Sequence, residues 1–535
     1  MPRCAGSNLL LPAVRYRAAS ATDADEAVII FQTRVKLPSE LVSYAEVTKA
    51  SESKTPTVSS GELRHYSNSG VPSGIKQRPT LYYLCHVSAQ LPPAFPPSSL
   101  QTAMTTTING KTTATSWAMY MRSLYADRQP PTLGTVAVDK LEEAAREKLK
   151  DRIEAFLYVF GSAGTCSTHD YNRNDFHKYK IIPRMLRDAT HRTLETTLFG
   201  VQYPSPLLLA PIGVQGIVHP DGELATSGAA AKVGIPYIMS TASTRSIEAV
   251  AQASGSGPRW YQLYWPKSNE LTLSVLSRVK KAGFSALVIT LDTMLLGWRP
   301  HDIDTAYLPF LHGVGTQVGF TDPVFMAQFG KDAYPVDHAP QWPYDPAHLD
   351  ERIRQGDETA KEHAFLGERW IGEVASGVFR PWEDLAFLKQ NWDGPIILKG
   401  IMCPEDAELA IDHGVDGIVV SNHGGRQVDG SISTLYALDK IMQSPKVREA
   451  QASGRFTILF DSGIRTGSDV IKAIALGAQA VLYGRPFMYA LALGGQDGVE
   501  SQIRAILADV HVTLGLSGFK NLDEIRGKAG VLARD

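Results

Sequence analysis

The stretch that decides the fold reads FTILFDSGIRTGSDVIKAIALGAQAVLYGR and spans residues 456–485. It opens with a short apolar run of the kind found in buried strands. It continues through a Gly-containing turn into a helical segment at residues 467–477 and closes with a second apolar run before Gly484 and Arg485. A strand, a helix and a strand in this order predict a β/α unit of a parallel sheet.

The same unit recurs along the C-terminal part of the chain. Helical segments such as GELATSGAAAKVG at residues 222–234 and EDAELAIDHG at residues 405–414 separate short apolar runs. Eight such units favour a closed parallel (β/α)8 barrel, the TIM barrel, over an open sheet. The predicted strands are PLLLAPIGV from residue 206, PYIMST from 236, RWYQLYW from 259, ALVITLD from 286, GPIILKG from 394, GIVVSN from 417, FTILFDSG from 456 and AVLYGR from 480.

Three segments fall outside this alternation of strands and helices. Residues 293–393 separate the fourth and fifth predicted strands, and a connection of that length indicates a long loop that covers the barrel mouth as a lid. Residues 138–160 carry apolar side chains at helical spacing and predict a helical lead-in. Residues 1–114 are rich in Ser, Thr, Pro and Ala, so we interpret them as a largely disordered extension of a 115–535 barrel domain, with a small folded module as the alternative.

Charge and composition narrow the class of protein. The 535 residues include 53 Lys and Arg against 55 Asp and Glu, so no basic field points to nucleic acid or to an anionic membrane. The four cysteines lie far apart, which predicts no metal site and a reducing compartment. No run is long and apolar enough for a membrane span and no secretory signal is visible, so we expect a cytoplasmic protein, with peroxisome or mitochondrion as alternatives.

Polar or turn-forming residues stand at the C-terminal end of each predicted strand. In a barrel these ends meet at the face that carries the chemistry. A single such residue is readily explained as a buried polar group, but eight strands that end this way predict a shared site. The residues are Pro211 and Gly213, Ser240, Gln262 and Tyr264, Thr290 and Asp292, Lys399, Ser421 with Asn422 and His423, Asp461, and Gly484 with Arg485.

The sharpest local motif is SNHGGRQ at residues 421–427. His423 and Arg426 stand three residues apart around two glycines, so both side chains can point into one pocket. An imidazole is the natural general base at neutral pH, and a guanidinium matches a carboxylate in two-point fashion. The motif predicts a base beside a carboxylate clamp, and the alternative is an exposed Gly-rich turn.

Glycines and arginines follow the last two predicted strands. They occur in DSGIR at residues 461–465 and in Gly484–Arg485. This is where barrels commonly build a phosphate site from backbone N–H groups and cations, so a phosphorylated cofactor is predicted. No GxGxxG motif follows an early strand, so a Rossmann-type nicotinamide site has no support.

Over about residues 117–530 the chain resembles the FMN-dependent L-2-hydroxy acid oxidising family. SNHGGRQ is similar to the active-site signature of that family, and YQLYW, TLDT, ILKGI and LFDSGIRTGSDVIKAIALGAQAVLYGRP match family blocks in order. The resemblance implies an enzyme with FMN as cofactor, a small L-2-hydroxy acid as substrate, and assembly as a homotetramer or homo-octamer.

The resemblance also implies roles for individual residues. His423 would remove a proton during substrate oxidation, and Asp292 would stabilise the resulting imidazolium. The substrate carboxylate would be held by Arg426, Arg299 and Tyr158, with Tyr264 near the substrate hydroxyl or carbonyl oxygen.

The cofactor would be held along its whole length. Lys399 would face the N1 and O2 edge of the flavin, where a cation stabilises the anionic reduced form. The flavin ring would meet Pro211, Gly213, Ser240, Gln262, Thr290 and Ser421, and the ribityl phosphate would meet Asp461, Gly463, Arg465, Gly484 and Arg485.

Two details resemble lactate 2-monooxygenase within the family. Gly213 stands where many family oxidases have alanine, which is expected to leave room near the reactive edge of the flavin, and the 293–393 segment is long. The implied reaction is oxidation of L-lactate by O2 with oxidative decarboxylation. Ala242 stands where glycolate oxidases carry a tryptophan, which indicates a pocket open to lactate or a larger acid.

Other readings of the same residues remain open. The enzyme could instead release the 2-keto acid and H2O2 as an oxidase, or pass electrons to another acceptor as a dehydrogenase. Lys399 at a strand end could form a Schiff base in a lyase. A barrel kept for binding alone is the non-enzymatic alternative.

Overall fold

The computed structural model describes residues 107–108, 111–112 and 116–535, all of which belong to one compact unit. Within it, two short strands, β1 (Thr107–Ile108) and β2 (Lys111–Thr112), pair antiparallel. The interpretation of residues 1–114 as a disordered extension otherwise lies outside the described residues.

Eight parallel strands close into a barrel in the order β10-β11-β12-β13-β6-β7-β8-β9, so the predicted TIM barrel is confirmed. Each predicted run supplies one strand. The strands are β6 (Leu207–Leu209), β7 (Tyr237–Ser240), β8 (Arg259–Leu263), β9 (Leu287–Thr290), β10 (Ile396–Ile401), β11 (Gly417–Val420), β12 (Thr457–Phe460) and β13 (Ala480–Tyr483).

The strands are buried on both faces, which explains why they read as continuous apolar runs rather than alternating ones. Alternate residues along a strand point inward and outward. One cluster of buried side chains fills the barrel interior with at least one residue from each strand, and a second cluster joins the strands to the surrounding helices. The interior cluster includes Leu208, Ile238, Trp260, Val288, Ile397, Val419, Leu459 and Leu482.

Helices cover the outside of the barrel. They pack in chain order around the strands, and α17 begins with a capping box in which Thr466 and Asp469 satisfy each other's backbone N–H groups. The helix α18 is interrupted at Gly494 and Gly495, where the backbone leaves helical geometry. The outer helices are α5 (Glu223–Val233), α6 (Ile247–Ser254), α7 (Asn269–Lys281), α14 (Pro404–Asp412), α15 (Thr434–Ile441), α16 (Pro445–Ala452), α17 (Gly467–Leu476) and α18 (Arg485–Leu516).

The predicted helical lead-in at residues 138–160 is observed as two helices, α2 (Val138–Lys148) and α3 (Ile153–Phe160), joined by a 3-10 turn. Helix α1 (Met119–Asp127) precedes them and α4 (Ser167–Asn174) follows. Helices α2 and α3 both pack on α18, which closes the barrel after its last strand. The lead-in therefore brings residues 158–168 to the strand ends.

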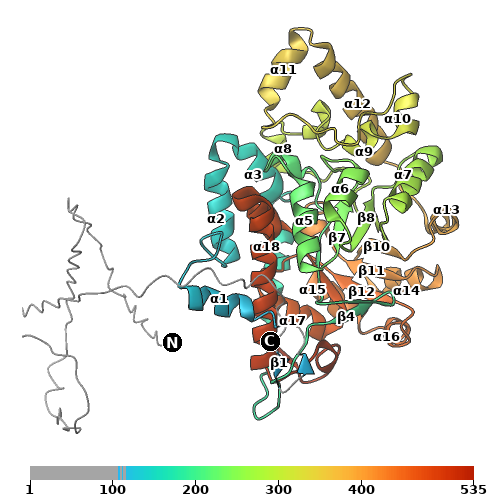
Figure 1. Ribbon diagram of the computed structural model, residues 1–535. Coiled ribbons are helices and arrows are strands. Elements are labelled where there is room, and N and C mark those ends of the chain that lie inside the picture. Colours follow the sequence, from blue (N-terminus) through green and yellow to red (C-terminus); the bar gives the residue numbers. More distant parts are fainter. Residues whose placement is uncertain (1–106, 109–110, 113–115) are drawn as a thin grey trace, which may run out of the picture. The chain divides into compact units, whose positions relative to one another are not determined.

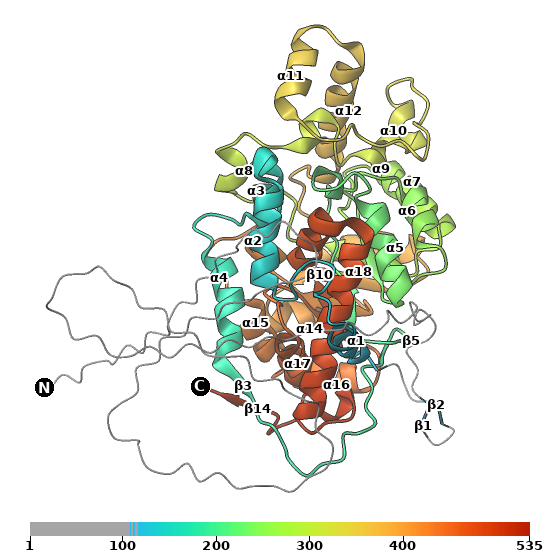
Figure 2. The same ribbon diagram turned by 60° about the vertical axis from the view of Figure 1, so that its left-hand side comes forward.

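Residues 293–393 form a largely helical insert rather than one continuous loop. Figures 1 and 2 show α11 and α12 of this insert standing at one end of the barrel. Asp345 and Asp357 cap the N-termini of α11 and α12, and the charged residues of both helices lie on exposed faces, which explains why this stretch reads as polar. The helices are α8 (Pro300–Ile303), α9 (Gln317–Phe320), α10 (Pro323–Ala327), α11 (Pro346–Arg354), α12 (Glu358–Val374) and α13 (Leu385–Asn391).

Among the described residues, we find no helix with both the length and the apolar character that crossing a membrane requires.

Candidate active site

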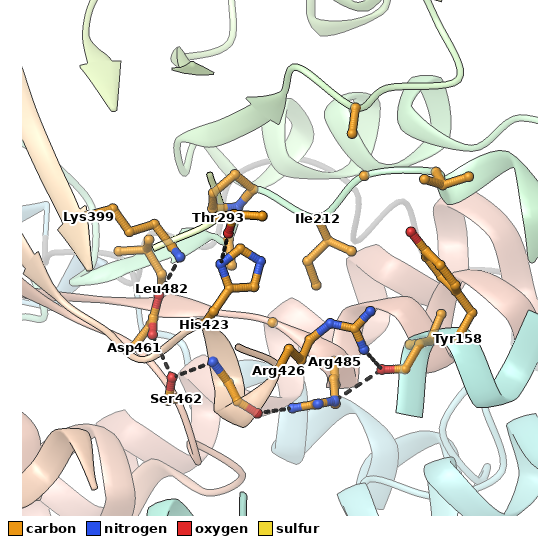
Figure 3. Close-up of a pocket in the computed structure, with 18 of the residues that line it drawn as sticks. Tyr158, Ile212, Thr293, Lys399, His423, Arg426, Asp461, Ser462, Leu482 and Arg485 are labelled. Atoms are coloured by element: carbon orange, nitrogen blue, oxygen red, sulfur yellow. Dashed lines mark hydrogen bonds and ion pairs between the residues drawn. The ribbon is translucent and has the colours of Figure 1, made fainter. Parts of the chain in front are cut away.

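A pocket opens at the C-terminal ends of the barrel strands, with about 1320 Å³ of empty space including its open mouth. In Figure 3, His423 lies between Lys399 on one side and Arg426 with Tyr158 on the other. Loops from most of the strands contribute to the lining, as the strand-end pattern predicts. The predicted site residues that line it are Tyr158, Pro211, Gly213, Tyr264, Arg299, Lys399, His423, Arg426, Asp461, Gly463, Arg465, Gly484 and Arg485.

The remaining predicted residues lie just behind this lining. Asp292 contacts His423, and the Ser421 hydroxyl accepts a hydrogen bond from the His423 backbone N–H at 3.1 Å. Ser240 and Thr290 are buried at the ends of β7 and β9. The predicted set is thus brought to one place in the structure.

His423 is held by a carboxylate and a hydroxyl. Its Nδ1 lies 2.8 Å from Asp292 Oδ1 and 3.1 Å from Thr293 Oγ1, while the Thr293 hydroxyl donates to the same Asp292 oxygen at 2.9 Å. An ionised carboxylate only accepts hydrogen bonds, so the proton of the neutral imidazole sits on Nδ1. Nε2 is therefore left with the free lone pair.

Burial and charge set the ionisation of this pair. Burial lowers the pKa of His423 to about 4, against the opposing pull of the Asp292 carboxylate. Burial would raise the pKa of Asp292, but the charges of Lys399 and His423 and the hydrogen bonds to it outweigh that effect and hold it below its usual value. At neutral pH the pair is a neutral imidazole beside a carboxylate, the form that a general base requires.

The backbone at His423 is unusual. His423, Gly424 and Gly425 have φ values of 58°, 67° and 78°, so three consecutive residues are left-handed. Glycine adopts this region freely, whereas histidine adopts it at a cost. The turn is secured because the side chains of Ser421, Ser462 and Asn422 accept hydrogen bonds from the three backbone N–H groups in turn.

Two arginines reach the pocket beside His423. Arg426 donates to the Gly161 carbonyl at 2.6 Å and its guanidinium lies 5.5 Å from the Tyr158 ring centre. Arg299 donates to the Arg426 carbonyl at 3.0 Å and to Gln427 Oε1 at 2.7 Å. Burial lowers the pKa of Arg426 to about 9, which still leaves it charged at neutral pH.

Two phenols stand near these arginines. Burial raises the pKa of Tyr158 and of Tyr264 to about 12 each. Both hydroxyls therefore keep their protons at neutral pH and are available as donors. Two guanidinium groups and two O–H donors around one space form a receptor for an anion such as a carboxylate.

The opposite side of His423 carries Lys399 and Asp461. Lys399 is buried and its Nζ lies 3.9 Å from Asp461 Oδ2, while Ser462 donates to Asp461 Oδ1 at 2.7 Å. Burial raises the pKa of Asp461, partly offset by the Lys399 charge. The lysine is thus a fixed cation at the wall of the pocket.

The two predicted phosphate-binding arginines differ in how many hydrogen bonds their side chains already make within the protein. The side chain of Arg465 makes one hydrogen bond, from its guanidinium to the Ile464 carbonyl, and its buried Nε has no partner among the described residues. Arg485 instead donates to the carbonyls of Val159, Gly161 and Gly424, as well as to Ser162. Arg485 ties the lead-in to the His423 turn, so Arg465 is the better candidate for an anion.

Unpartnered polar atoms test whether a flavin fits here. The buried Gln262 accepts hydrogen bonds from Ser240 and from the Thr241 backbone through Oε1, yet its Nε2 has no partner among the described residues. Buried N–H groups are rarely left unsatisfied. Together with Arg465 Nε and the Lys399 cation, this donor set suits a planar group with ring acceptors and a phosphate tail.

The structure gives Gly213 a different role from the one expected. A Cβ at Gly213 would lie 2.6 Å from the Ala242 carbonyl oxygen and 2.8 Å from the Ala242 Cβ. The missing methyl group therefore allows the loops after β6 and β7 to pack closely, and does not simply leave space beside the cofactor. The Val214 N–H donates to the same Ala242 carbonyl at 2.8 Å.

Several pocket residues were not predicted from the sequence. Thr293 lines the pocket and orients His423, whereas Gln427 lies outside the lining and orients Arg299. They belong to the motifs TLDT and SNHGGRQ, so their positions are a usable signal. The apolar residues that the insert contributes to the pocket belong to no recognisable motif, and their common position is seen only in the folded structure. These lining residues are Leu296, Phe310, Ile371, Val374 and Ala375.

Comparison with known protein sequences agrees with this geometry. The sequence model of the family described as FMN-dependent dehydrogenase matches residues 145–531. An FMN-dependent alpha-hydroxy acid dehydrogenase of Schizosaccharomyces pombe is 46% identical over 70% of this chain and 86% of its own length. An L-lactate oxidase of Lysinibacillus sphaericus is 41% identical over 72% of this chain and 90% of its own length.

Solved structures give the same result. A crystal structure of a mandelate oxidase with benzoylformic acid is 33% identical to the chain, with a TM-score of 0.58 over 75% of this chain and 98% of the other.

Proposed function

The chain belongs to the FMN-dependent dehydrogenase family and is an FMN-dependent 2-hydroxy acid oxidoreductase; from this premise we propose that it oxidises L-lactate, with O2 as acceptor and with oxidative decarboxylation of the product. The observation that carries the proposal is the neutral His423, hydrogen-bonded to Asp292 at 2.8 Å beside two arginines.

His423 acts as the base. With its Nδ1 proton directed to Asp292, the lone pair on Nε2 accepts the proton that the substrate loses. The imidazolium formed is stabilised by the adjacent carboxylate. Thr293 fixes the carboxylate against rotation through its hydroxyl.

Arg299, Arg426, Tyr158 and Tyr264 bind the substrate. The two guanidinium groups hold the carboxylate, and the two phenols donate hydrogen bonds to its oxygens and to the 2-oxygen. This orientation leaves C2 beside His423. Holding the reacting atoms in place is expected to supply a large part of the rate.

Lys399, Gln262 and Arg465 would hold the FMN. When bound, FMN would accept the two electrons that the substrate loses on oxidation. The Lys399 cation would stabilise negative charge on a bound flavin, the unpartnered Gln262 Nε2 would donate a hydrogen bond to it, and Arg465 would hold its phosphate.

The decarboxylating outcome follows if the keto acid stays in the pocket while O2 reacts. One lactate and one O2 then give acetate, CO2 and water. The 293–393 insert supports slow product release because it supplies part of the pocket wall. Release of pyruvate with H2O2 is the second candidate, and the similarity to an L-lactate oxidase favours it.

A single experiment tests these statements. The purified protein is mixed with L-lactate under argon while the flavin absorbance is followed, and then in air while pyruvate, acetate and H2O2 are quantified together. We expect a yellow protein that bleaches under argon and forms acetate without peroxide in air. Pyruvate with equal peroxide would make it an oxidase, and a yellow protein that no 2-hydroxy acid bleaches would overturn the proposal.

A further inference from the structure

One wall of the pocket has no polar side chain. It combines two residues of barrel loops with five residues of the insert, and it lies on the same cavity as His423 and Arg426. The members of this apolar wall are Val214, Ala242, Leu296, Phe310, Ile371, Val374 and Ala375.

The wall is built on a packed helix. Ile371 and Val374 stand three residues apart at the C-terminal end of α12 and so lie on one face of that helix, and Ala375 follows directly as its C-cap residue. Trp370 of the same helix is fully buried, and its ring centre lies 5.2 Å from that of Phe325 on α10. The face is therefore presented by a rigid element.

Phe310 joins this face to the barrel. Its helical turn, Pro309–His312, packs against α12. A Cβ at Gly315 would lie 2.8 Å from the Phe310 ring and 3.0 Å from a Val214 methyl group, so both side chains approach the same backbone point. The wall is continuous from the loop after β6 to the end of α12.

The position of the wall fixes which part of a substrate meets it. The carboxylate is directed to Arg299 and Arg426, C2 to His423, and the cofactor to the side with Lys399 and Arg465. The substituent on C2 is the part left to face the wall. A methyl group would leave most of this apolar surface in contact with water, which is unfavourable in proportion to the apolar area exposed.

We propose, resting on the function proposed above, that the preferred substrates are L-2-hydroxy acids whose side chain is bulky and carries no polar group, either branched aliphatic or aromatic. Ile371 and Val374 set the upper size of that side chain. L-Lactate is then the smallest member of the class. Each methylene-sized group buried against the wall raises kcat/KM by about fourfold.

The test is a substrate series with the FMN-loaded enzyme. Flavin reduction under argon is measured for L-lactate, L-2-hydroxyisocaproate, L-3-phenyllactate and L-malate, in which the side chain is charged. We expect kcat/KM for the two large apolar acids to exceed that for L-lactate by about tenfold or more, and L-malate to be poorer than L-lactate.

Substitutions on α12 test whether the apolar wall contacts the substrate side chain. Val374→Phe is expected to lower the ratio of kcat/KM for L-3-phenyllactate over L-lactate by about tenfold or more, because the added ring occupies the space beside the wall. Glu368→Phe, at an exposed position of the same helix, is the matched control and should leave the ratio unchanged. If Val374→Phe does not retain FMN, Ile371→Phe at the half-buried neighbouring position replaces it.

The two proposals fail in different ways. L-Lactate outperforming every larger apolar acid in a bleachable enzyme would overturn the side-chain assignment and leave the oxidation itself standing. An unchanged ratio in both wall variants would place the side chain elsewhere in the pocket. No bleaching by any acid in the series would remove the proposed function instead.

Discussion

Asp292 controls both the tautomer and the charge of His423, although it does not line the pocket. A carboxylate is required because it accepts a hydrogen bond from the Nδ1–H group and offsets the positive charge that forms on the ring. An amide of the same shape would present a donor or a weaker acceptor. The sequence motif TLDT predicted Asp292, but only the structure shows that Thr293 restrains it.

Asp292→Asn is expected to lower the rate of flavin reduction by L-lactate by about 10²- to 10⁴-fold, the range of general base catalysis. FMN content should stay the same, because the other groups assigned to the cofactor are untouched. Stopped-flow absorbance under argon measures the rate. Asp393→Asn, in an exposed ion pair with Lys280, is the control, and equal rates in the two variants would contradict the assignment.

The pH profile tests the state of His423 directly. The base works when neutral, so activity is lost as the pH falls through its pKa, which burial lowers to about 4. We expect kcat/KM to stay high at pH 6 and 5 and to decline near pH 4. In Asp292→Asn the decline should move to lower pH because a stabilising anion is gone. A decline centred near pH 6.5 would show an unperturbed imidazole.

At the scale of elements, Asp429 fastens the loop after the His423 turn to residues 165–167, which connect the lead-in to α4. The Asp429 carboxylate accepts hydrogen bonds from the backbone and hydroxyl groups of both Thr165 and Ser167, at 2.6 to 3.0 Å. These bonds hold the pKa of Asp429 well below its ordinary value. The same connection between α3 and α4 includes Gly161, whose carbonyl accepts a hydrogen bond from Arg426, so the Asp429 contacts affect the carboxylate receptor.

Asp429→Ala is expected to lower the melting temperature by a few degrees at pH 7 and to raise KM for L-lactate, since the turn loses its anchor to residues 165–167. A depressed carboxyl pKa contributes stability above its unfolded pKa of about 4 and loses that contribution as the pH falls. The difference from the unaltered protein should therefore shrink below about pH 4. Asp170→Ala, an exposed position on α4, is the control for calorimetry.

At the scale of the whole molecule, a cofactor held at the ends of several strands should stabilise the barrel as a unit. FMN at about one hundred times its Kd is expected to add about 2.7 kcal/mol to the free energy of unfolding. Scanning calorimetry with and without FMN measures the gain. Arg465→Ala should reduce it more than Lys520→Ala, at an exposed position outside the pocket, and an equal gain in the two variants would remove Arg465 from the phosphate site.

The sequence predicted the barrel well and the pocket wall poorly, for physical reasons. Strands buried on both faces leave a strong signal, and residues such as Lys399 and His423 at their ends are aligned by the barrel itself. The sequence of the insert does not show which residues line the pocket. One face of α12 is exposed, and its apolar residues can be assigned to the pocket only when the position of the helix over the strand ends is known. Arg485 stays a predicted phosphate ligand that lines the pocket, and only the structure shows that its guanidinium also donates to three carbonyl groups and to Ser162.

The left-handed turn at His423 has a consequence for timing. Three successive residues in that conformation, each with its N–H bound to a side chain, leave the imidazole few orientations to explore. The entropy of orienting the base is lost once, when the chain folds, and not again at each turnover. The proton acceptor is already oriented when a substrate binds, so only the substrate must reach its reactive orientation before proton transfer.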